Sequence, residues 1–294
     1  MMRGLQFVLG ASCLLALLAA PAFATEGHAL HGVGPVNESI GGSGTAAILE
    51  PLGAIAWNPA GMQRLRRGWT VGLGATYFMP SRRLSSSVPL PGGGLFSGST
   101  RSEANPAVMP ACALSYNPRC SPRLGFHVEM YGMGGFGVEY PQSSNNPIQA
   151  PQPAGFGKIQ SDYEMMRLPI GLSYRATRKL SVGFSLVPGC ASLRVAPAPF
   201  ATPNPDGTYP LADRFAQAWG IGAQVGVHYQ ATPCLGLGLS VSTPTWFETH
   251  KWNTVDHLGV RRDISFDLDF PMIVSGGVAW QATPNTLIAA DMRW

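Results

Sequence analysis

The residues best suited to do chemistry in this sequence are a few histidines and aspartates. His28 and His31 are spaced so that both could lie on one face of a helix and bind a metal ion. A zinc site needs three or four ligands, and we find no cysteine or carboxylate in support of this pair. His250, Asp256 and His257 fall in one predicted loop, where solvated side chains are the simpler interpretation. The sequence therefore predicts no metal site.

Catalytic and nucleotide-binding patterns are not recognisable either. The chain has no Gly-x-Ser-x-Gly elbow and no coherent set of Ser, His and Asp, which argues against an esterase or phospholipase. Gly32-x-Gly34 does not follow a predicted strand, so a nucleotide site is unsupported. Asp263, Asp267 and Asp269 share one face of a predicted strand, where a hydrated wall is favoured over a substrate site. We predict a protein that is not an enzyme and has no cofactor.

The N-terminus directs the chain out of the cytoplasm. Arg3 supplies a positive charge, the residues from Phe7 to Leu18 are apolar, and Ala22-Phe23-Ala24 is a small-x-small site. This is the pattern of a signal peptide, so we expect residues 1–24 to be removed. Four cysteines then remain, without Cys-x-x-Cys spacing: Cys112, Cys120, Cys190 and Cys234. Disulfides are possible in an oxidising compartment, although small strand or turn residues are the favoured interpretation.

Composition and periodicity favour a transmembrane β-barrel over a soluble fold. Charged residues make up only 12% of the chain, hydrophobic residues 45%, and there are 36 glycines. After the signal peptide no apolar stretch reaches the ~20 residues of a membrane helix. Instead, apolar residues alternate with Gly, Ser, Asp and His in segments of the length that a tilted barrel strand needs. The net charge of +4 is scattered, so we predict no nucleic-acid partner.

Short turns and long loops alternate along the predicted strands. An aromatic residue precedes each short turn at Tyr116, Tyr174, Tyr229 and Trp280, as in the aromatic girdle of a barrel. Short turns are periplasmic in such barrels, and long loops, here near 79–106, 141–161, 195–213 and 243–262, are extracellular. Nine strands are predicted, near 68–78, 107–116, 123–139, 163–175, 180–193, 214–229, 235–242, 263–280 and 286–294. Bacterial barrels have an even number, so we expect an incomplete C-terminus or a miscount of one strand.

The segment 25–67 does not alternate and is too apolar for a plain linker. Ile48, Leu49, Leu52, Ile55, Trp57 and Met62 fall close together among glycines and alanines. We expect short helical turns that plug the lumen of the barrel at 68–294, with a disordered periplasmic tail as the alternative.

At this point the chain resembles a known family. The stretch from Gly41 to Met62, which ends in Ala56-Trp57-Asn58-Pro59-Ala60-Gly61-Met62, is similar to the N-terminal hatch of the FadL/TodX-type outer-membrane transporters. Weaker resemblances occur at Gly135–Tyr140, Leu168–Gly183, Ala218–Gly222 and Leu268–Trp294. Known members form fourteen-stranded barrels, so the resemblance implies that about five strands are missing here.

The resemblance implies passive transport of long-chain fatty acids or similar hydrophobic compounds across the outer membrane. A substrate is captured at the extracellular loops, passes to a pocket above the hatch and leaves sideways through a kink in the third strand. The residues assigned to substrate binding and gating are Ile55, Trp57, Asn58, Pro59 and Ala60 in the hatch and Gly134, Gly135, Phe136 and Gly137 in the third strand.

Some of these expectations also stand on the residues themselves. Glycines at 132, 134, 135 and 137 mark a bulge, a bend or close packing against the hatch. Arg167 or Arg175 could meet a carboxylate head group, and the sequence does not choose between them. We therefore predict a monomeric transporter in contact with outer-membrane lipid. A general diffusion porin and a structural or adhesive barrel are the alternatives.

Overall fold

The segment before the first strand folds into three short helices. The computed structural model describes residues 29–294, so the predicted signal peptide and His28 lie outside the described residues. The helices are α2 (Pro35–Ser39), α3 (Pro51–Trp57) and the 3-10 helix η1 (Pro59–Arg64), and each begins with proline, whose fixed φ suits a first helical position. Glu50 caps α3 by accepting from the amides of Leu52 and Gly53 at 2.8 and 2.7 Å. Among residues 29–294, no helix is long and apolar enough to cross a membrane.

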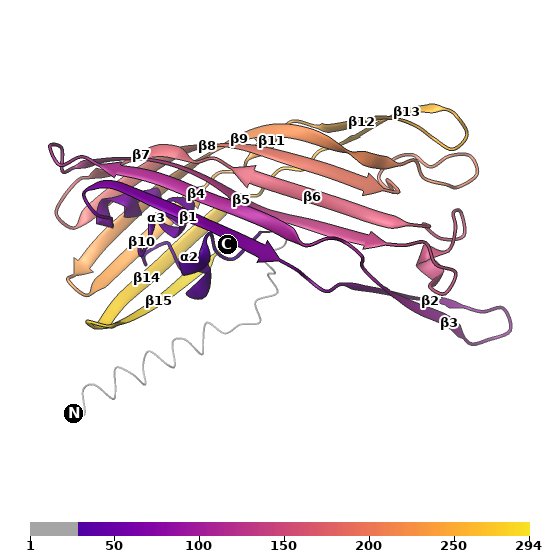
Figure 1. The fold of residues 1–294 in the computed structure, drawn as a ribbon, viewed down its shortest axis with the longest axis horizontal. Coiled ribbons are helices and arrows are strands. Elements are labelled where there is room, and N and C mark those ends of the chain that lie inside the picture. The colour runs from indigo at the N-terminus through magenta and orange to yellow at the C-terminus, as the bar shows by residue number, and fades with distance from the viewer. Residues whose placement is uncertain (1–28) are drawn as a thin grey trace.

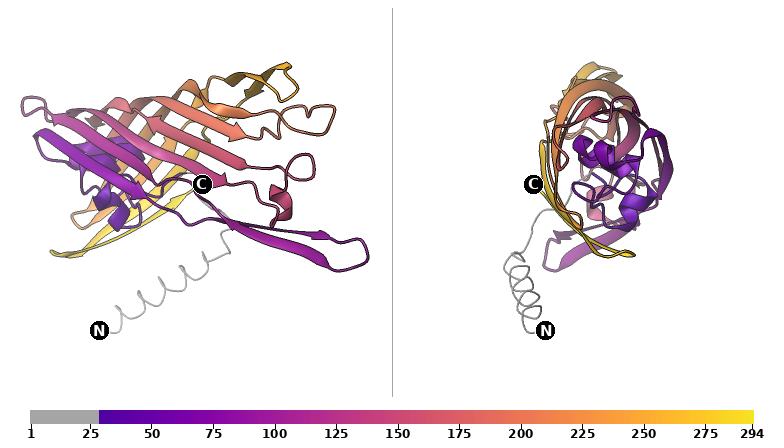
Figure 2. Two further views of the ribbon diagram at one scale, coloured as in Figure 1. Left: turned by 45° about the vertical axis from the view of Figure 1, so that its right-hand side comes forward. Right: turned by 90° about the vertical axis from the view of Figure 1, so that its left-hand side faces the viewer.

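The strands form one large antiparallel sheet that curves around these helices (Figures 1 and 2). Neighbours along the sheet are consecutive along the chain apart from the loop hairpins, so each connection is a hairpin or a long loop. In chain order, the strands are β1 (Gly68–Phe78), β4 (Ala107–Asn117), β5 (Leu124–Tyr140), β6 (Ile159–Arg167), β7 (Ile170–Arg175), β8 (Leu180–Ala196), β9 (Ala212–Thr232), β10 (Leu235–Ser242), the short β11 (Trp246–Phe247), β14 (Ile273–Thr283) and β15 (Thr286–Arg293).

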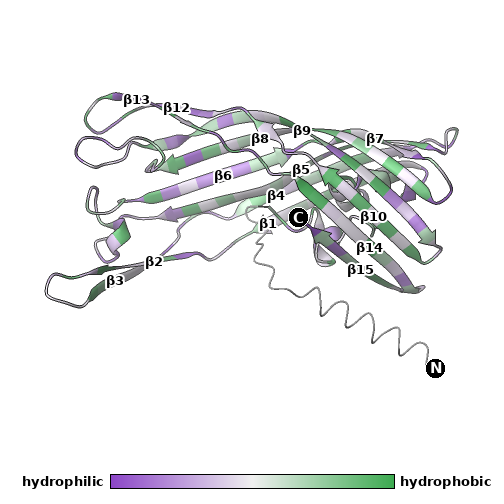
Figure 3. Cartoon of the chain, turned by 180° about the vertical axis from the view of Figure 1, so that it is seen from behind, coloured by the Kyte–Doolittle hydropathy of each residue, from purple (hydrophilic) through white to green (hydrophobic). Residues whose placement is uncertain are grey.

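Long loops extend from one end of the sheet and short turns close the other (Figure 1). The long loops hold two hairpins of their own, β2 (Arg83–Pro89) with β3 (Leu95–Arg101) and β12 (His250–Val255) with β13 (Arg261–Phe266), and the 3-10 helix η2 (Pro147–Gln149). The outer face of the wall is apolar: Trp69, Val71 and Leu73 on β1 are 67%, 61% and 75% exposed. Figure 3 shows hydrophobic residues recurring along the strands. The predicted aromatics are partly or largely exposed at the short-turn end, and Trp69 stacks on Tyr116 at 4.4 Å.

Two of the predicted strands are wrong in detail. The strand expected at 163–175 breaks at Leu168-Pro169 into β6 and β7, because proline has no N–H for the ladder. The strand expected at 263–280 is also divided. Its first part, β13, pairs with β12 in a loop hairpin, and the wall strand β14 starts only at Ile273, beyond Pro271. The other seven wall strands lie where the alternation predicts them.

The N-terminal segment lies against both edges of the sheet. β1 and β15 are those edges, and no pairing joins them among the described residues. The absent side chain of Gly72 on β1 leaves room for Pro51 and Leu52. On β15, the Asp291 carboxylate accepts from the amides of Gly44 and Thr45 at 2.8 and 2.9 Å. Figure 2 shows the helices within the curve of the sheet, so the core forms between the segment and the inner face of the wall.

Candidate functional site

The wall has a local opening between β4 and β5. These strands pair from Tyr116↔Phe126 to Ala111↔Tyr131, and within the described residues the pairing goes no further. Beyond Tyr131, β5 continues to Tyr140 and β6 is its only partner among the described strands, while the rest of β4 pairs only with β1. Pro110, the first β4 residue past the last pair, has no N–H to donate. The hydrogen-bonded wall is therefore interrupted in the half that lies toward the long loops.

A bulge in β5 accompanies the opening. The register between β5 and β6 shifts between Gly132 and Gly134, which leaves Met133 as the extra residue, with 1% of its surface exposed. A Cβ on Gly132 would lie 3.0 Å from the Cβ of Met109 on β4. A Cβ on Gly135 would collide with the backbone carbonyl of Tyr163 on β6. Glycine at these positions thus permits close approach of the backbones.

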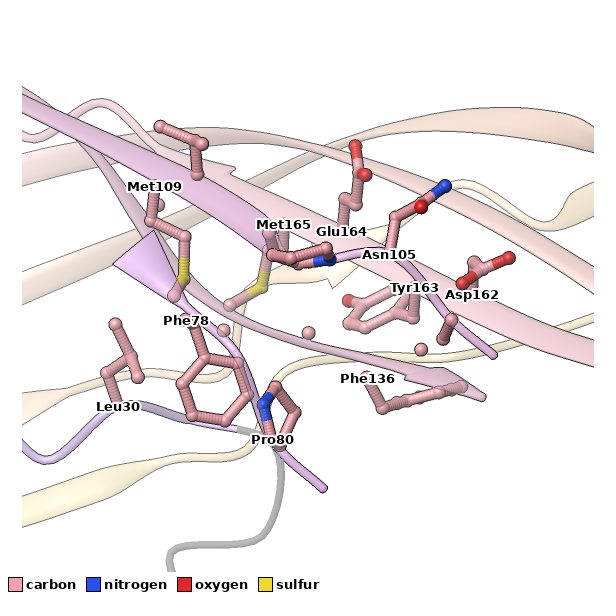
Figure 4. A pocket seen from close by; sticks show the side chains of 18 of the residues that line it. Leu30, Phe78, Pro80, Asn105, Met109, Phe136, Asp162, Tyr163, Glu164 and Met165 are labelled. Carbon is pink, nitrogen blue, oxygen red and sulfur yellow. The ribbon is translucent and has the colours of Figure 1, made fainter. Parts of the chain in front are cut away.

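A cavity of about 440 Å³ occupies this opening (Figure 4). Its volume is within the range of pockets that hold drug-sized ligands. Phe136 and Tyr163 stack at 5.4 Å on one side of it. The other apolar lining residues come from β1 and the loop after it, from β4, β6 and β9, and from the N-terminal segment, and they include Leu30, Phe78, Pro80, Met109 and Met165. The cavity is thus suited to an apolar molecule.

The N-terminal segment reaches the same cavity. The amide of Leu30 donates to the carbonyl of Met133 at 2.8 Å, and Ala29 forms an antiparallel bridge with Gly134. Leu30 also lines the cavity, together with Ala29. The first described residues therefore act as a short extra strand on the bulge of β5.

Charged side chains line one part of the cavity. Arg194 Nε lies 2.6 Å from Asp162 Oδ2, and its guanidinium stacks over the ring of Phe215 at 4.6 Å. Arg82 donates to the carbonyl of Gly137. These two arginines are the cavity's cationic groups, and the sequence did not point to them, because neither lies in a motif.

The arginines proposed from the sequence for a carboxylate head group lie elsewhere. Arg167 is buried and donates to Ser242 Oγ at 2.8 Å, and Arg175 donates to the carbonyl of Gln63 near the short turns. Neither lines the cavity, so neither is placed to meet a head group there. Alternation places a side chain inside the wall, but it does not tell how far along the lumen.

The predicted site residues separate into two groups. Gly134, Gly135, Phe136 and Gly137 all line the cavity. The hatch residues Ile55, Trp57, Asn58, Pro59 and Ala60 do not line it, and all five are buried.

Asn58 organises the second group. Its amide donates to the carbonyls of Thr45 and Val227 at 2.7 and 3.0 Å, and its Oδ1 accepts from the amide of Ala60 at 3.1 Å. Trp57 packs under the guanidinium of Arg293, 3.5 Å from the ring centroid. These contacts attach the N-terminal segment to β9 and β15.

Of the three residues near position 250 that the sequence assigns to a solvated loop, His257 is exposed as expected, but His250 and Asp256 are not. His250 is fully buried and its Nδ1 lies 2.9 Å from the carbonyl of Ala216, and Asp256 is buried too, because the β12–β13 hairpin packs back on β9. Asp263, Asp267 and Asp269 are exposed beside that hairpin and do not form a lumen wall. In the described part of the chain, no three His, Cys, Asp or Glu side chains are grouped for a metal, and the four cysteines are unpaired.

The fold has close relatives among solved structures. It matches the toluene transporter TodX of Pseudomonas putida (18% identity, TM-score 0.66, 90% of this chain and 70% of that chain). It also matches the toluene transporter TbuX of Ralstonia pickettii (22% identity, TM-score 0.66, 90% and 72%) and a FadL homologue of Pseudomonas aeruginosa (15% identity, TM-score 0.63, 91% and 69%). No curated protein sequence matches the chain. The TM-scores show that the chain shares the fold of these proteins, and sequence identities this low show nothing beyond the fold.

The sequence profile of the outer membrane protein transport proteins (OMPP1/FadL/TodX) matches residues 18–294. The chain belongs to this family. It is therefore an outer-membrane protein with the β-barrel fold of FadL and TodX, and it is a transporter of hydrophobic compounds, not an enzyme.

Proposed function

We propose that this FadL/TodX-family protein imports long-chain fatty acids or comparable hydrocarbons, and that they leave sideways into the membrane through the β4–β5 opening. The cavity in the opening carries the proposal, because it is lined from both strands whose pairing is interrupted. An apolar molecule that leaves through the wall passes directly into the hydrocarbon region of the membrane. It thus avoids a passage through water, which the hydrophobic effect disfavours.

The relatives of known substrate are consistent with this class of compound. TodX and TbuX are described as toluene transporters, and the structure of CymD as a monoaromatic hydrocarbon channel. Beside its apolar residues, the cavity lining here holds two arginines, Arg82 and Arg194, and three carboxylates, Glu139, Asp162 and Glu164. Because a carboxylate binds well to a guanidinium, a fatty acid would compete with these carboxylates for the arginines, whereas a neutral hydrocarbon needs only the apolar lining.

The N-terminal segment is proposed to be the hatch that closes the direct route. Ile55, Ala60 and Met62 have no exposed surface, so the segment packs as a core against the wall. A general diffusion porin needs a continuous water-filled lumen, which this packing disfavours. The Leu30–Met133 hydrogen bond extends the hatch to the cavity itself. Release of that contact would free the β5 bulge for the passage of substrate.

A reversible cross-link across the opening tests the lateral route. The Cβ atoms at 109 and 132 would lie 3.0 Å apart, close to the ~3.5–4.5 Å that a disulfide needs. The experiment uses Met109→Cys with Gly132→Cys in a chain whose four described cysteines are serine, and it measures uptake of labelled oleate and toluene by cells. Uptake by the double-cysteine variant should fall on oxidation and return on reduction. In each single-cysteine control, oxidation should leave uptake unchanged. Undiminished uptake by fully cross-linked protein would overturn the lateral route.

A further inference from the structure

The cations at the short-turn end are gathered in one sector of the molecule. Eight arginine and lysine side chains lie there, out of 20 in the whole chain. We call them the basic face: Arg64, Arg66 and Arg67 after η1, Arg119 and Arg123 in the β4–β5 turn, and Arg175, Arg178 and Lys179 around the β7–β8 turn. No aspartate or glutamate occurs in 64–67, 117–123 or 175–179. The other short turns, at 232–235 and 283–286, carry no charged residue at all.

Hydrogen bonds to the backbone bring these three segments together. Arg67 donates to the carbonyl of Pro122, in the β4–β5 turn. The amide of Arg175 donates to the carbonyl of Arg123 at 2.7 Å, and its guanidinium donates to the carbonyl of Gln63. The end of the N-terminal segment and two turns thus form one continuous surface, and their charges are forced into proximity.

The basic face has no anionic partner within the protein. None of the eight side chains makes an ion pair with any residue in the range 29–294. Arg64, Arg66, Arg119, Arg123, Arg178 and Lys179 are exposed, and Arg67 and Arg175 are partly buried. Like charges held close together repel one another, and a bound anion removes that cost. The surface is therefore complementary to an anion supplied from outside the chain.

The position of the face indicates which anion this is. It lies directly beyond the stacked Trp69 and Tyr116 and the exposed Tyr174, at the end of the apolar outer wall. Aromatic side chains of this kind occupy the level of the lipid head groups. Short turns mark the periplasmic end, where the leaflet consists of phospholipids. Clusters of four to eight arginines and lysines next to a membrane bind anionic lipid head groups.

We propose that the basic face binds the phosphate groups of anionic phospholipids in the periplasmic leaflet. A bound head group would bridge the β4–β5 turn, the β7–β8 turn and the residues that leave η1. The lipid would then stabilise the joint between the N-terminal segment and the wall strands on either side of it. This site differs from the transport cavity in location and in chemistry, and it does not depend on the transported compound.

Lipid binding by the purified full-length protein tests the proposal. Native mass spectrometry would compare phosphatidylglycerol with phosphatidylcholine of the same acyl chains, in detergent. The test variant carries Arg119→Gln, Arg123→Gln, Arg178→Gln and Lys179→Gln. The control variant carries Arg83→Gln, Arg101→Gln, Lys251→Gln and Arg261→Gln, which removes the same charge from exposed positions at the extracellular end. Heat-dependent gel mobility reports whether each variant is folded.

The wild-type protein and the control variant should bind phosphatidylglycerol at least about 10-fold more tightly than phosphatidylcholine. In the test variant, the affinities for the two lipids should differ by no more than about 2-fold. Equal affinity of the wild type for both lipids, or an equal loss in both variants, would overturn the proposal. Soluble glycerol phosphate serves as a further arm. If it displaces the lipid at the same concentration, the site recognises a free phosphate and the assignment to lipid is wrong. If the test variant is unfolded, the wild-type comparison still decides.

Discussion

Gly183 on β8 and Gly226 on β9 are cross-strand partners, and together they form the seat of the Asn58-Pro59-Ala60 turn. A Cβ on Gly183 would collide with the backbone of Pro59 and Ala60, and one on Gly226 with Asn58 Oδ1. The wall thus has a flat site where the backbone of the N-terminal segment can approach it. The same arrangement recurs at Gly238 and Gly277, which are partners on β10 and β14 and lie against Thr45.

A methyl group in this seat should loosen the N-terminal segment. Gly183→Ala meets backbone atoms that cannot rotate away, so overpacking should cost about 1–3 kcal/mol. Limited proteolysis of the folded protein should then cut the N-terminal segment faster than in the wild type. Gly276→Ala is the matched control, since a Cβ at that position meets nothing within 4 Å. Equal protection of the segment in both variants would contradict the proposed seat.

Replacing Asn58 should have an effect that depends on the new side chain. Asn58→Ala loses three hydrogen bonds in a fully buried site, at about 1–3 kcal/mol for each group left unsatisfied. Asn58→Asp should destabilise more, because a carboxylate would face the carbonyls of Thr45 and Val227. Hydrogen exchange of residues 45–62 and oleate uptake would measure the two effects. The exposed Asn253→Ala is the control, and an Asn58→Asp variant as stable as the wild type would refute the amide's role.

Alternation is why the wall was predictable. A strand whose two faces meet lipid and lumen repeats every two residues, so β1, β8 and β9 follow directly from the sequence. Alternation does not distinguish wall strands from loop strands at Phe266 and Phe270. They continue the same period, but β13 belongs to a loop hairpin and the wall resumes after Pro271. Periodicity identifies a strand and not the sheet in which it pairs.

The site was predictable only in part, for a related reason. The glycines of β5 are visible because glycine inside a strand marks a bulge. The contact of Leu30 with Met133 joins two backbones, and no side chain in either segment signals it. Arg82 and Arg194 come from distant segments, and only the curvature of the sheet brings them to one cavity. The sequence therefore indicates local irregularities better than it indicates what converges on them.

The cap of α3 should make the N-terminal segment sensitive to pH. Burial raises the pKa of Glu50 above its ordinary 4.5, against the amides of Gly53 and Leu52, which lower it. A raised pKa in the folded state means that the protonated form contributes stability below pH 4.5, and that this contribution is lost as pH rises through the raised value. Glu50→Gln should therefore remove part of the loss of protection of the N-terminal segment as the pH rises above 4.5.

The comparison for Glu50 is the difference between the variant and the wild type at each pH, measured by hydrogen exchange of residues 45–62. Exposed Glu103→Gln controls for the change in net charge. If Glu50→Gln and the wild type lose the same protection as pH rises, the carboxyl of Glu50 does not govern the segment.

The pairing of Arg194 with Asp162 should set the preference of the cavity between charged and neutral substrates. Arg194→Gln removes a cation from the cavity lining. Oleate uptake should fall about 10-fold, because that is the change in affinity that corresponds to the free energy of one hydrogen bond to a charged group. Toluene carries no charge, and its uptake should stay within about 2-fold. Asp162→Asn should act in the opposite sense, because it releases the guanidinium for a carboxylate. Exposed Lys251→Gln, which removes a cation outside the cavity lining, is the control. Parallel changes for oleate and toluene would show that the pair supports the wall without selecting the substrate.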